Sequence, residues 1–569
     1  MHKDSALPGN LDIARAACLK PLTEVVEPFG IAADRLIPYG RKLAKVDLGV
    51  LEDLPERPRG KYIVVTATTP TPLGEGKTTT AVGLAQALNR LGERTMLTLR
   101  QPSMGPTFGV KGGAAGAGYS QVVPMEELNL HLTGDAHAVA AAHNLLAAVV
   151  DNHLFQGNEL GIDERTITWR RVLDVNDRAL RNIVIGLGGR MDGVTRQAGF
   201  DITAASEVGV ILAMATSLAD LRQRLGRIVV GYTRDGRPVT AEDLKAAGSM
   251  AVIMKEAIHP NLLQTLEHTP VLVHAGPFGN IATGNSSIVA DQIGVRSADY
   301  VLTEAGFGSD MGAERFFNIK CRVSGLRPDG AVIVTTVRAL KAHSGRFQIV
   351  PGRPLPPELL AESPDDVRAG LANLAKHIDI VRGFGVVPVV AINAFPGDHD
   401  SEHRVIGELC ESLGVHYAVS RHVAEGGAGA LDLARAVMAA CEQPAELRYT
   451  YDLGETLRAK IVAVAREVYG AQDVTFNPVA ARELDRIESL GYGELPVVLA
   501  KTHLSISADK ALVGAPRGWI LPVREVRLAA GAGYVYAICG DMSTMPGLAK
   551  HAALEVIDLD GDGETVGLS

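Results

Sequence analysis

The sequence is poor in cysteine and in aromatic residues, and it has no surplus of basic charge. Five cysteines are scattered over 569 residues without a C-x-x-C pair, which argues against a disulfide framework and a zinc site. A formal net charge of -9 offers no basic field to hold nucleic acid. Apolar runs such as 209–219 are shorter than a membrane span, and the N-terminus has no apolar signal core. We therefore expect a soluble protein of the reducing cytoplasm that binds neither nucleic acid nor membranes.

Short β-branched runs alternate along the chain with segments of helical periodicity. The clearest runs, each bounded by Gly or Pro, are residues 61–67, 182–187, 227–232, 270–275 and 386–393. Apolar runs that alternate with helices are typical of buried parallel strands. The sequence therefore predicts an α/β fold built on a parallel sheet.

Proline marks the clearest boundary in the chain. The segment 350–366, VPGRPLPPELLAESPDD, is rich in proline, which lacks a backbone donor and restricts the residue before it. We expect a linker there, with a large unit over 1–365, a second α/β unit over 366–475 and a small C-terminal unit over 476–569.

The stretch TPLGEGKT lies between the apolar run 61–67 and a helical pattern, as a phosphate-binding loop does. Gly74 and Gly76 would let backbone amides turn toward phosphate oxygens at the N-terminus of the helix. Lys77 would contact the transferred phosphate, and Thr78 would bind Mg²⁺. The usual pattern opens with a glycine where this chain has Thr71. The predicted ATP site consists of Thr71, Pro72, Leu73, Gly74, Glu75, Gly76, Lys77 and Thr78.

Arg100 ends the next strand-like run, RTMLTLR. Open parallel sheets bind their ligands at the carboxyl ends of strands, where the planar guanidinium of an arginine can grip an anion. Two prolines and six glycines lie between 102 and 118, which we expect to be a long loop unsuited to a helix or a central strand.

Several long motifs are similar to those of a known family. They include PTPLGEGKTTT, GFDITAASEV, TEAGFGSDMGAERFFNIKCR and VREVRLAAGAGYVYAICGDMSTMPG, which occur in this order. With them the chain resembles formate-tetrahydrofolate ligase over nearly its whole length. The resemblance implies a three-domain α/β protein, usually a homotetramer, whose large domain holds the phosphate loop. Such an enzyme uses MgATP to join formate to N10 of tetrahydrofolate through formyl phosphate.

The resemblance also implies roles for individual residues. Lys77 and Mg²⁺ would stabilise the transferring phosphoryl group, and Arg100 would hold the formyl phosphate oxygens. Asp135 would bind the pterin or accept its proton, although an Asp that only caps a loop remains an alternative. Phe307 and Phe395 stand at aromatic positions of the folate pocket, to which the second unit contributes; ordinary packing is the alternative for Phe395.

The chain departs from the family pattern at several positions. Val423 replaces a Trp of the folate-stacking platform, and Gln101 replaces a Glu associated with a monovalent cation in many bacterial members. Four further changes are Asp192, Thr195, Thr283 and Asn285 in place of Asn, Pro, His and Cys. We expect these changes to lie on the folate side and to leave the phosphate side intact.

Three functions remain open from the sequence. The first is synthesis of 10-formyltetrahydrofolate from formate, ATP and tetrahydrofolate. The second is a divergent ligase that accepts a modified pterin or another one-carbon acceptor. The third is a non-catalytic, nucleotide-binding regulator, against which the intact Lys77, Thr78 and Arg100 speak.

Overall fold

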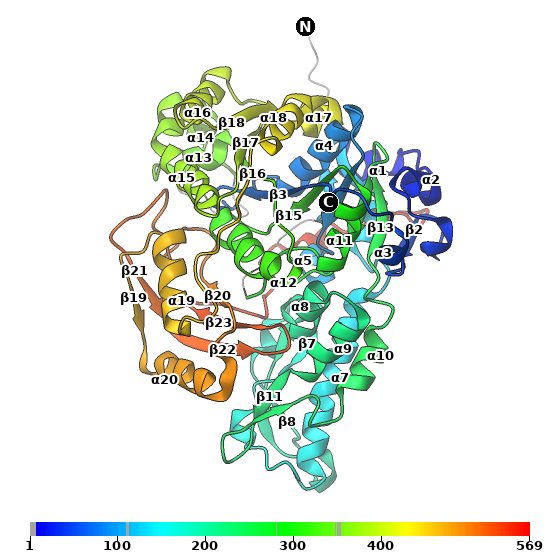
Figure 1. The fold of residues 1–569 in the computed structure, drawn as a ribbon, viewed down its shortest axis with the longest axis vertical. Coiled ribbons are helices and arrows are strands. Elements are labelled where there is room, and N and C mark those ends of the chain that lie inside the picture. The colour runs from blue at the N-terminus through cyan, green and yellow to red at the C-terminus, as the bar shows by residue number, and fades with distance from the viewer. Residues whose placement is uncertain (1–6, 110–112, 280, 348, 350–353, 569) are drawn as a thin grey trace.

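The computed structural model describes residues 7–109, 113–279, 281–347, 349 and 354–568. Within these residues the largest element is a mixed sheet of twelve strands in the upper half of Figure 1. Its main path runs β1 (Leu36–Tyr39), β2 (Leu43–Val46), β13 (Asn261–Thr265), β14 (Pro270–Val273), β4 (Thr95–Leu99), β15 (Tyr300–Glu304), β3 (Lys61–Ala67), β16 (Gly330–Thr335), β17 (Pro388–Asn393) and β18 (His416–Ser420). Off this path, β6 (Ser120–Val123) pairs with β13 and with β5 (Gly116–Ala117).

The sheet divides into an antiparallel and a parallel part. Neighbours from β1 to β14 are antiparallel, and neighbours from β14 to β18 are parallel. The predicted parallel sheet is therefore confirmed for the second part only, and the whole sheet is mixed. The carboxyl ends of β4, β15, β3, β17 and β18 lie along one edge, because parallel strands end on the same side.

Helices cover both faces of the parallel part. Tyr62 and Val64 of β3 belong to one core, and the alternating Ile63 and Val65 belong to the other. The first core includes residues of α11 (Ile288–Ser297), α13 (Val337–His343), α15 (Pro364–Gly383) and α16 (Asp400–Ser412), and the second includes residues of α4 (Lys77–Arg90) and α18 (Leu431–Cys441). Strands buried on both faces explain the continuous apolar runs in the sequence.

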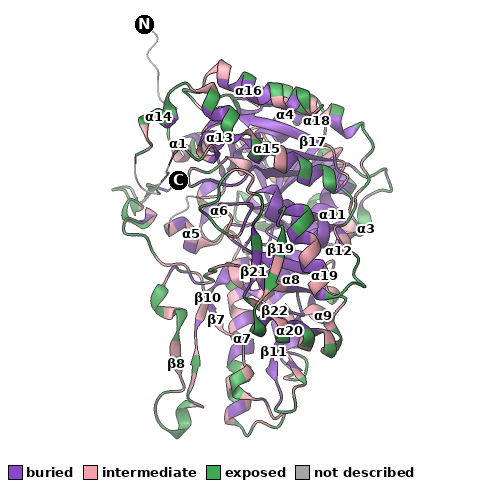
Figure 2. Cartoon of the chain, turned by 90° about the vertical axis from the view of Figure 1, so that its left-hand side faces the viewer, coloured by how far each residue is buried: buried purple, intermediate pink, exposed green. Residues whose placement is uncertain are grey.

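A third apolar core lies below the sheet in Figure 1, in a lobe of helices and short strand pairs that we call the helical lobe. Its helices are α7 (Asp135–Phe155), α8 (Glu207–Met214), α9 (Leu218–Gly226) and α10 (Ala247–Met254). Its strand pairs are β7 (Arg171–Leu173) with β10 (Phe200–Ile202), β8 (Ile183–Ile185) with β9 (Arg196–Ala198), and β11 (Val229–Tyr232) with β12 (Pro238–Thr240). The β8–β9 hairpin projects from this lobe and is largely exposed (Figure 2).

Two of the five predicted central strands are wrong. The runs 182–187 and 227–232 form β8 and β11, which belong to small antiparallel pairs instead of the central sheet. Val184 is 56% exposed between half-buried neighbours, so this run has the alternating burial of a hairpin strand. The segment 102–118 also contains a short helix, α5 (Met104–Phe108), which we did not expect.

The C-terminal part has small sheets of its own at the left of Figure 1. They are β19 (Asp473–Phe476) with β21 (Ile520–Val523), and β20 (Val497–Ala500) with β23 (Tyr534–Ile538) and β22 (Glu525–Ala529), flanked by α19 (Leu457–Ala463) and α20 (Pro478–Ile487).

The central sheet continues across the boundary expected near residue 365. Strand β17 pairs in parallel with β16, so the first and second expected units share one sheet. Residues 350–353 of the expected linker lie outside the described residues, and the three-part division stays a prediction.

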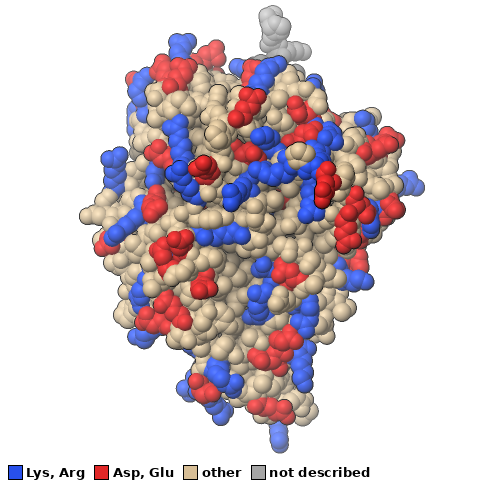
Figure 3. Space-filling model, in the orientation of Figure 1, with Lys and Arg blue, Asp and Glu red and all other residues tan. Residues whose placement is uncertain are grey.

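Acidic and basic side chains lie close to one another over most of the face in Figure 3. None of the described helices is both long enough and apolar enough to cross a bilayer.

Candidate active site

The predicted phosphate loop joins the carboxyl end of β3 to the first residue of α4, Lys77. Gly74 and Gly76 have φ values of 75° and 73°, in the left-handed region that glycine enters without strain. A Cβ at Gly76 would lie 2.5 Å from the Asn393 side-chain amide. The backbone amides at the start of α4 supply partial positive charge beside the half-buried Lys77.

Thr71 has a structural task at the position where the usual pattern has glycine. Its backbone N–H and its hydroxyl both donate to one oxygen of the buried Glu75 carboxylate, at 2.6 and 3.0 Å. Burial raises the pKa of Glu75, while the charge of Lys77 and the bonds from Thr71 oppose that rise. Asn393, at the end of β17, donates to the Glu75 carbonyl at 3.0 Å. The loop is therefore closed on itself and tied to a neighbouring strand.

Glu304 joins the phosphate loop to Arg100. The Thr78 hydroxyl donates to Glu304 Oε2 at 2.9 Å, and an Arg100 Nη lies 3.6 Å from Glu304 Oε1. Arg100 follows β4 and Glu304 ends β15, and these strands are neighbours in the sheet. A Cβ at Gly306 would lie 2.9 Å from an Arg100 Nη, so glycine there leaves room for the guanidinium. Sequence reasoning missed Glu304 and Asn393, although each is a polar residue at the end of an apolar run.

Asp135 lies deeper, at the first turn of α7. Its two oxygens accept from Lys45 Nζ and from the Asn261 side-chain amide, both at 2.7 Å. Lys45 is buried, and burial lowers its pKa against the attraction of Asp135. Sequence reasoning also missed Lys45 and Asn261, which belong to β2 and β13.

Asp135 and the buried Gln101 line one small pocket of about 40 Å³. Other residues around it are Pro102, Ser103, Ala204 and Gly276. The backbone at Gln101 is fixed because its N–H donates to the Ala275 carbonyl at 2.8 Å. The structure therefore brings Asp135 and Gln101 together, beside the strand end that carries Arg100.

The three residues predicted for the folate side lie after the carboxyl ends of β15, β17 and β18, in different surroundings. Phe307 has a φ of 62°, unusual for a residue with a side chain, and its ring stacks on His503 with centroids 4.6 Å apart. Phe395 lies under the Arg338 guanidinium, 4.5 Å from the ring centroid. Val423, in α17 (His422–Glu425), accepts from the Tyr119 N–H at 2.9 Å.

The placement of the departures from the family pattern on the folate side stays a prediction, and the structure shows that they do not lie together in one place. Asp192 and Thr195 lie in the turn of the β8–β9 hairpin. The Asp192 carboxylate accepts a hydrogen bond from the Gly189 N–H, and the Thr195 hydroxyl donates one to the Gly186 carbonyl. Thr283 and Asn285 are buried, and the Asn285 amide approaches the Glu304 carbonyl at 3.4 Å. Asn285 is therefore close to the Thr78–Glu304–Arg100 group.

Comparisons with known proteins identify the family of the chain. A family model described as "Formate--tetrahydrofolate ligase" matches residues 8–569. A formate–tetrahydrofolate ligase of Cutibacterium acnes is 66% identical over 559 residues, which cover 98% of this chain and 99% of that protein. One of Saccharopolyspora erythraea is 65% identical over 563 residues, 99% of this chain and 100% of that protein. One of a Roseiflexus species is 61% identical over 98% of this chain and 100% of that protein. Because the family model and these relatives match nearly the whole chain, the chain belongs to the formate–tetrahydrofolate ligase family.

Proposed function

We propose that this protein uses ATP to join formate to N10 of tetrahydrofolate through formyl phosphate, giving 10-formyltetrahydrofolate, ADP and phosphate. The observation that carries the proposal is the group of Thr78, Glu304 and Arg100 beside the N-terminus of α4, in a chain that matches the family from residue 8 to 569. Such an edge of a parallel sheet is where α/β proteins bind phosphorylated ligands.

In the first step, a formate oxygen attacks the γ-phosphorus of ATP, and the bond from that phosphorus to the oxygen of ADP breaks. Negative charge collects on the transferring group. Lys77 and the amides of the loop 71–78 neutralise it from the nucleotide side, and Arg100 holds the oxygens of formyl phosphate from the formate side. The ion pair with Glu304 orients Arg100 before the reaction, as electrostatic catalysis requires.

Thr78 and Glu304 would hold Mg²⁺ during this step. Mg²⁺ prefers oxygen ligands and usually takes one or two carboxylates, with phosphates and water completing its shell. The Thr78 hydroxyl and the Glu304 carboxylate fit that donor set. When bound, Mg²⁺ neutralises phosphate charge.

Replacing the Glu304 carboxylate tests this metal site. We expect Glu304→Gln to raise the Mg²⁺ concentration for half-maximal activity by about 10- to 100-fold, the range seen when a metal's supporting groups are lost. Glu242→Gln, at an exposed ion pair of the helical lobe, is the matched control. Equal Mg²⁺ dependence of both variants would exclude Glu304 from the metal site.

In the second step, the N10 lone pair attacks the formyl carbon, the bond from carbon to the phosphate oxygen breaks, and N10 loses its proton. Asp135 already accepts two hydrogen bonds, from Lys45 and Asn261. Each of its oxygens keeps a second lone pair, so pterin binding and proton acceptance both stay open for Asp135. Phe307, Phe395 and Val423 would line the folate site, with residues of the second unit on one side of it.

A monovalent cation at Gln101 stays a prediction. The amide oxygen of a buried glutamine can bind such an ion, but it lacks the charge of the family's glutamate.

A homotetramer in the cytoplasm is likewise proposed from the resemblance. The exposed Leu187 and Met191 on the β8–β9 hairpin, 77% and 80% exposed, supply apolar surface for assembly. Sedimentation velocity gives the mass of the assembly, and a monomer would exclude it.

One assay tests the reaction itself. The release of ADP is measured with formate, with and without tetrahydrofolate, and 10-formyltetrahydrofolate is quantified. We expect stoichiometric ADP and folate product. Formate-dependent ADP release without folate product would support a divergent acceptor, and no turnover would support a regulator.

A further inference from the structure

Phe307 is held in place by three neighbouring segments. A Cβ at Gly279 would lie 2.7 Å from the Phe307 ring. A Cβ at Gly308, the next residue, would lie 3.0 Å from the His377 ring and 3.2 Å from the Thr68 carbonyl. These close approaches require glycine and leave the Phe307 loop little freedom.

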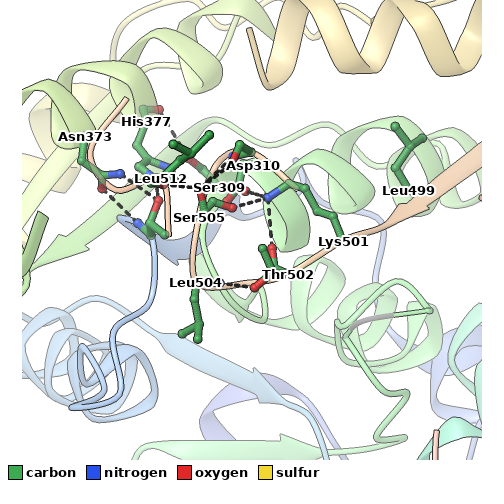
Figure 4. Close-up of polar contacts among 12 residues, drawn as sticks. Ser309, Asp310, Asn373, His377, Leu499, Lys501, Thr502, Leu504, Ser505 and Leu512 are labelled. Atoms are coloured by element: carbon green, nitrogen blue, oxygen red, sulfur yellow. Dashed lines mark hydrogen bonds and ion pairs between the residues drawn. The ribbon is translucent and has the colours of Figure 1, made fainter. Parts of the chain in front are cut away.

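A buried hydrogen-bond network ties the Phe307 loop to the phosphate loop. His377, on α15, bonds through Nδ1 to the Ser309 hydroxyl at 2.5 Å and through Nε2 to the Thr69 hydroxyl at 2.9 Å. Asn373, one turn earlier, donates to the same Thr69 hydroxyl at 2.8 Å and to the Gly514 carbonyl at 2.8 Å. Figure 4 shows His377, Ser309 and Asn373 gathered around this point.

An ion pair adds a turn of the C-terminal part to this network. Lys501 Nζ lies 2.6 Å from Asp310 Oδ2, and both side chains are almost fully buried. The same ammonium donates to the carbonyls of Thr502 and Ser505, at 3.3 and 2.6 Å (Figure 4). A second bond, from the Leu504 N–H to the Thr502 hydroxyl, crosses the turn at 3.2 Å. Residues 501–505 are thus fixed at both ends.

His503 lies within this fixed turn, and its ring is the one that stacks on Phe307, at an interplanar angle of 27°. A stacked ring limits the orientations of the Phe307 side chain. Because Lys501 and Asp310 lock the two backbones together, the stack is in place before any ligand binds.

We infer that His503 is a positioning residue of the acceptor site: it orients Phe307 for a flat heteroaromatic ligand, so the C-terminal part of the chain helps to bind the pterin. This inference rests on the proposed function, because it takes Phe307 to contact the pterin. His503 acts through Phe307 and needs no contact with the reacting atoms. The inference assigns this role to the stack with Phe307.

The test compares His503→Ala, His503→Gln and His503→Phe in the full chain. We expect His503→Ala and His503→Gln to raise the KM for tetrahydrofolate about 3- to 10-fold, the size of one lost aromatic contact, and to leave the KM for ATP and the Tm unchanged. His503→Phe should restore the KM, because it keeps the stack. His551→Ala, an exposed histidine of the same C-terminal part, is the matched control.

Phe307→Ala separates failure of the inference from failure of the proposed function. If Phe307→Ala raises the KM for tetrahydrofolate and His503→Ala does not, the inference is wrong and the folate site stands. Equal increases in the KM for ATP and tetrahydrofolate with a lower Tm would mean that His503 is only structural, which also overturns the inference. An unchanged KM in Phe307→Ala would remove Phe307 from the acceptor site and the inference with it.

Discussion

In the proposed function the sheet edge has a donor side, with Thr78, Arg100 and Glu304, and an acceptor side, with Phe307, Phe395 and Val423. The two sides are built in different ways. On the donor side, Thr78, Arg100 and Glu304 lie at the ends of regular elements, and Thr78 and Arg100 both contact Glu304. On the acceptor side, Phe307, Phe395 and Val423 lie in loops or a short helix, and each is supported by a different segment. Side chains on regular elements are positioned by the sheet itself, whereas loop residues depend on networks such as the one around His377. The groups proposed for the donor side act on the reacting atoms, so single changes there should have the larger effect on kcat.

The largest effect is expected at Arg100. Arg100→Ala removes the guanidinium that we propose faces the transferring group, and we expect kcat to fall by about 100- to 1,000-fold, as for other preorganised electrostatic groups. Arg100→Lys should recover little, because the planar fork is lost. Steady-state kinetics with saturating substrates measures both. Arg222→Ala, at an exposed ion pair with Glu242, is the matched control. A fall of less than five-fold for Arg100→Ala would contradict the role of Arg100 on the donor side.

Two buried histidines make both sides sensitive to acid. Burial lowers the pKa of His377 and of His422 to about 4. His377 links the two loops, and His422 lies next to Val423 with Nε2 3.3 Å from the Thr80 hydroxyl of α4. Since these pKa values lie below the ordinary 6.5, the unfolded chain takes up protons first as the pH falls. Stability is then full above pH 6.5 and is lost toward pH 4.

Urea unfolding at pH 7.5 and pH 5 measures this loss. Each histidine contributes about 2 kcal/mol to the difference between the two free energies of unfolding, from the shift of 6.5 to about 4. His377→Gln and His422→Gln should each reduce the pH dependence by about that amount. His137→Gln, at an exposed position of α7, should leave it unchanged. Equal pH dependence in all four proteins would show that other groups cause the acid lability.

The two sides also differ in how far the sequence predicts them. Strand, loop and helix around Lys77 follow from local patterns, so β3, α4 and the place of Arg100 were predicted. Glu304, Asn393 and Lys45 were missed because their partners are far away in sequence: Glu304 bonds to Thr78 across 226 positions. The run 182–187 was misread because a short apolar run does not reveal whether a sheet or solvent covers its second face.

The phosphate loop itself offers a smaller test. Thr71→Gly restores the glycine of the usual pattern but removes the hydroxyl that donates to Glu75, and it adds backbone freedom. We expect a loss of about 1 kcal/mol, seen as a several-fold higher KM for ATP with an unchanged KM for tetrahydrofolate. Thr71→Ser keeps the hydroxyl and is the control. If Thr71→Gly binds ATP as well as the parent, the bond to Glu75 has no part in shaping the donor side.

The smallest effect is expected at Val423, and it bears on the acceptor side alone. The chain lacks there the Trp ring that the family resemblance implies. The backbone of Val423 is fixed, because its carbonyl accepts from the Tyr119 N–H and lies close to Gly118. A Cβ added at Gly118 would lie 2.0 Å from that carbonyl oxygen. The side chain is half-buried. Val423→Trp should lower the KM for tetrahydrofolate about two- to five-fold by adding stacking surface, with the KM for ATP unchanged. Val423→Leu adds volume without a ring and should not lower it. If both variants keep the parent KM, Val423 lies outside the acceptor site. Phe307 must then supply by itself the stacking on the pterin that a Trp at position 423 would have added.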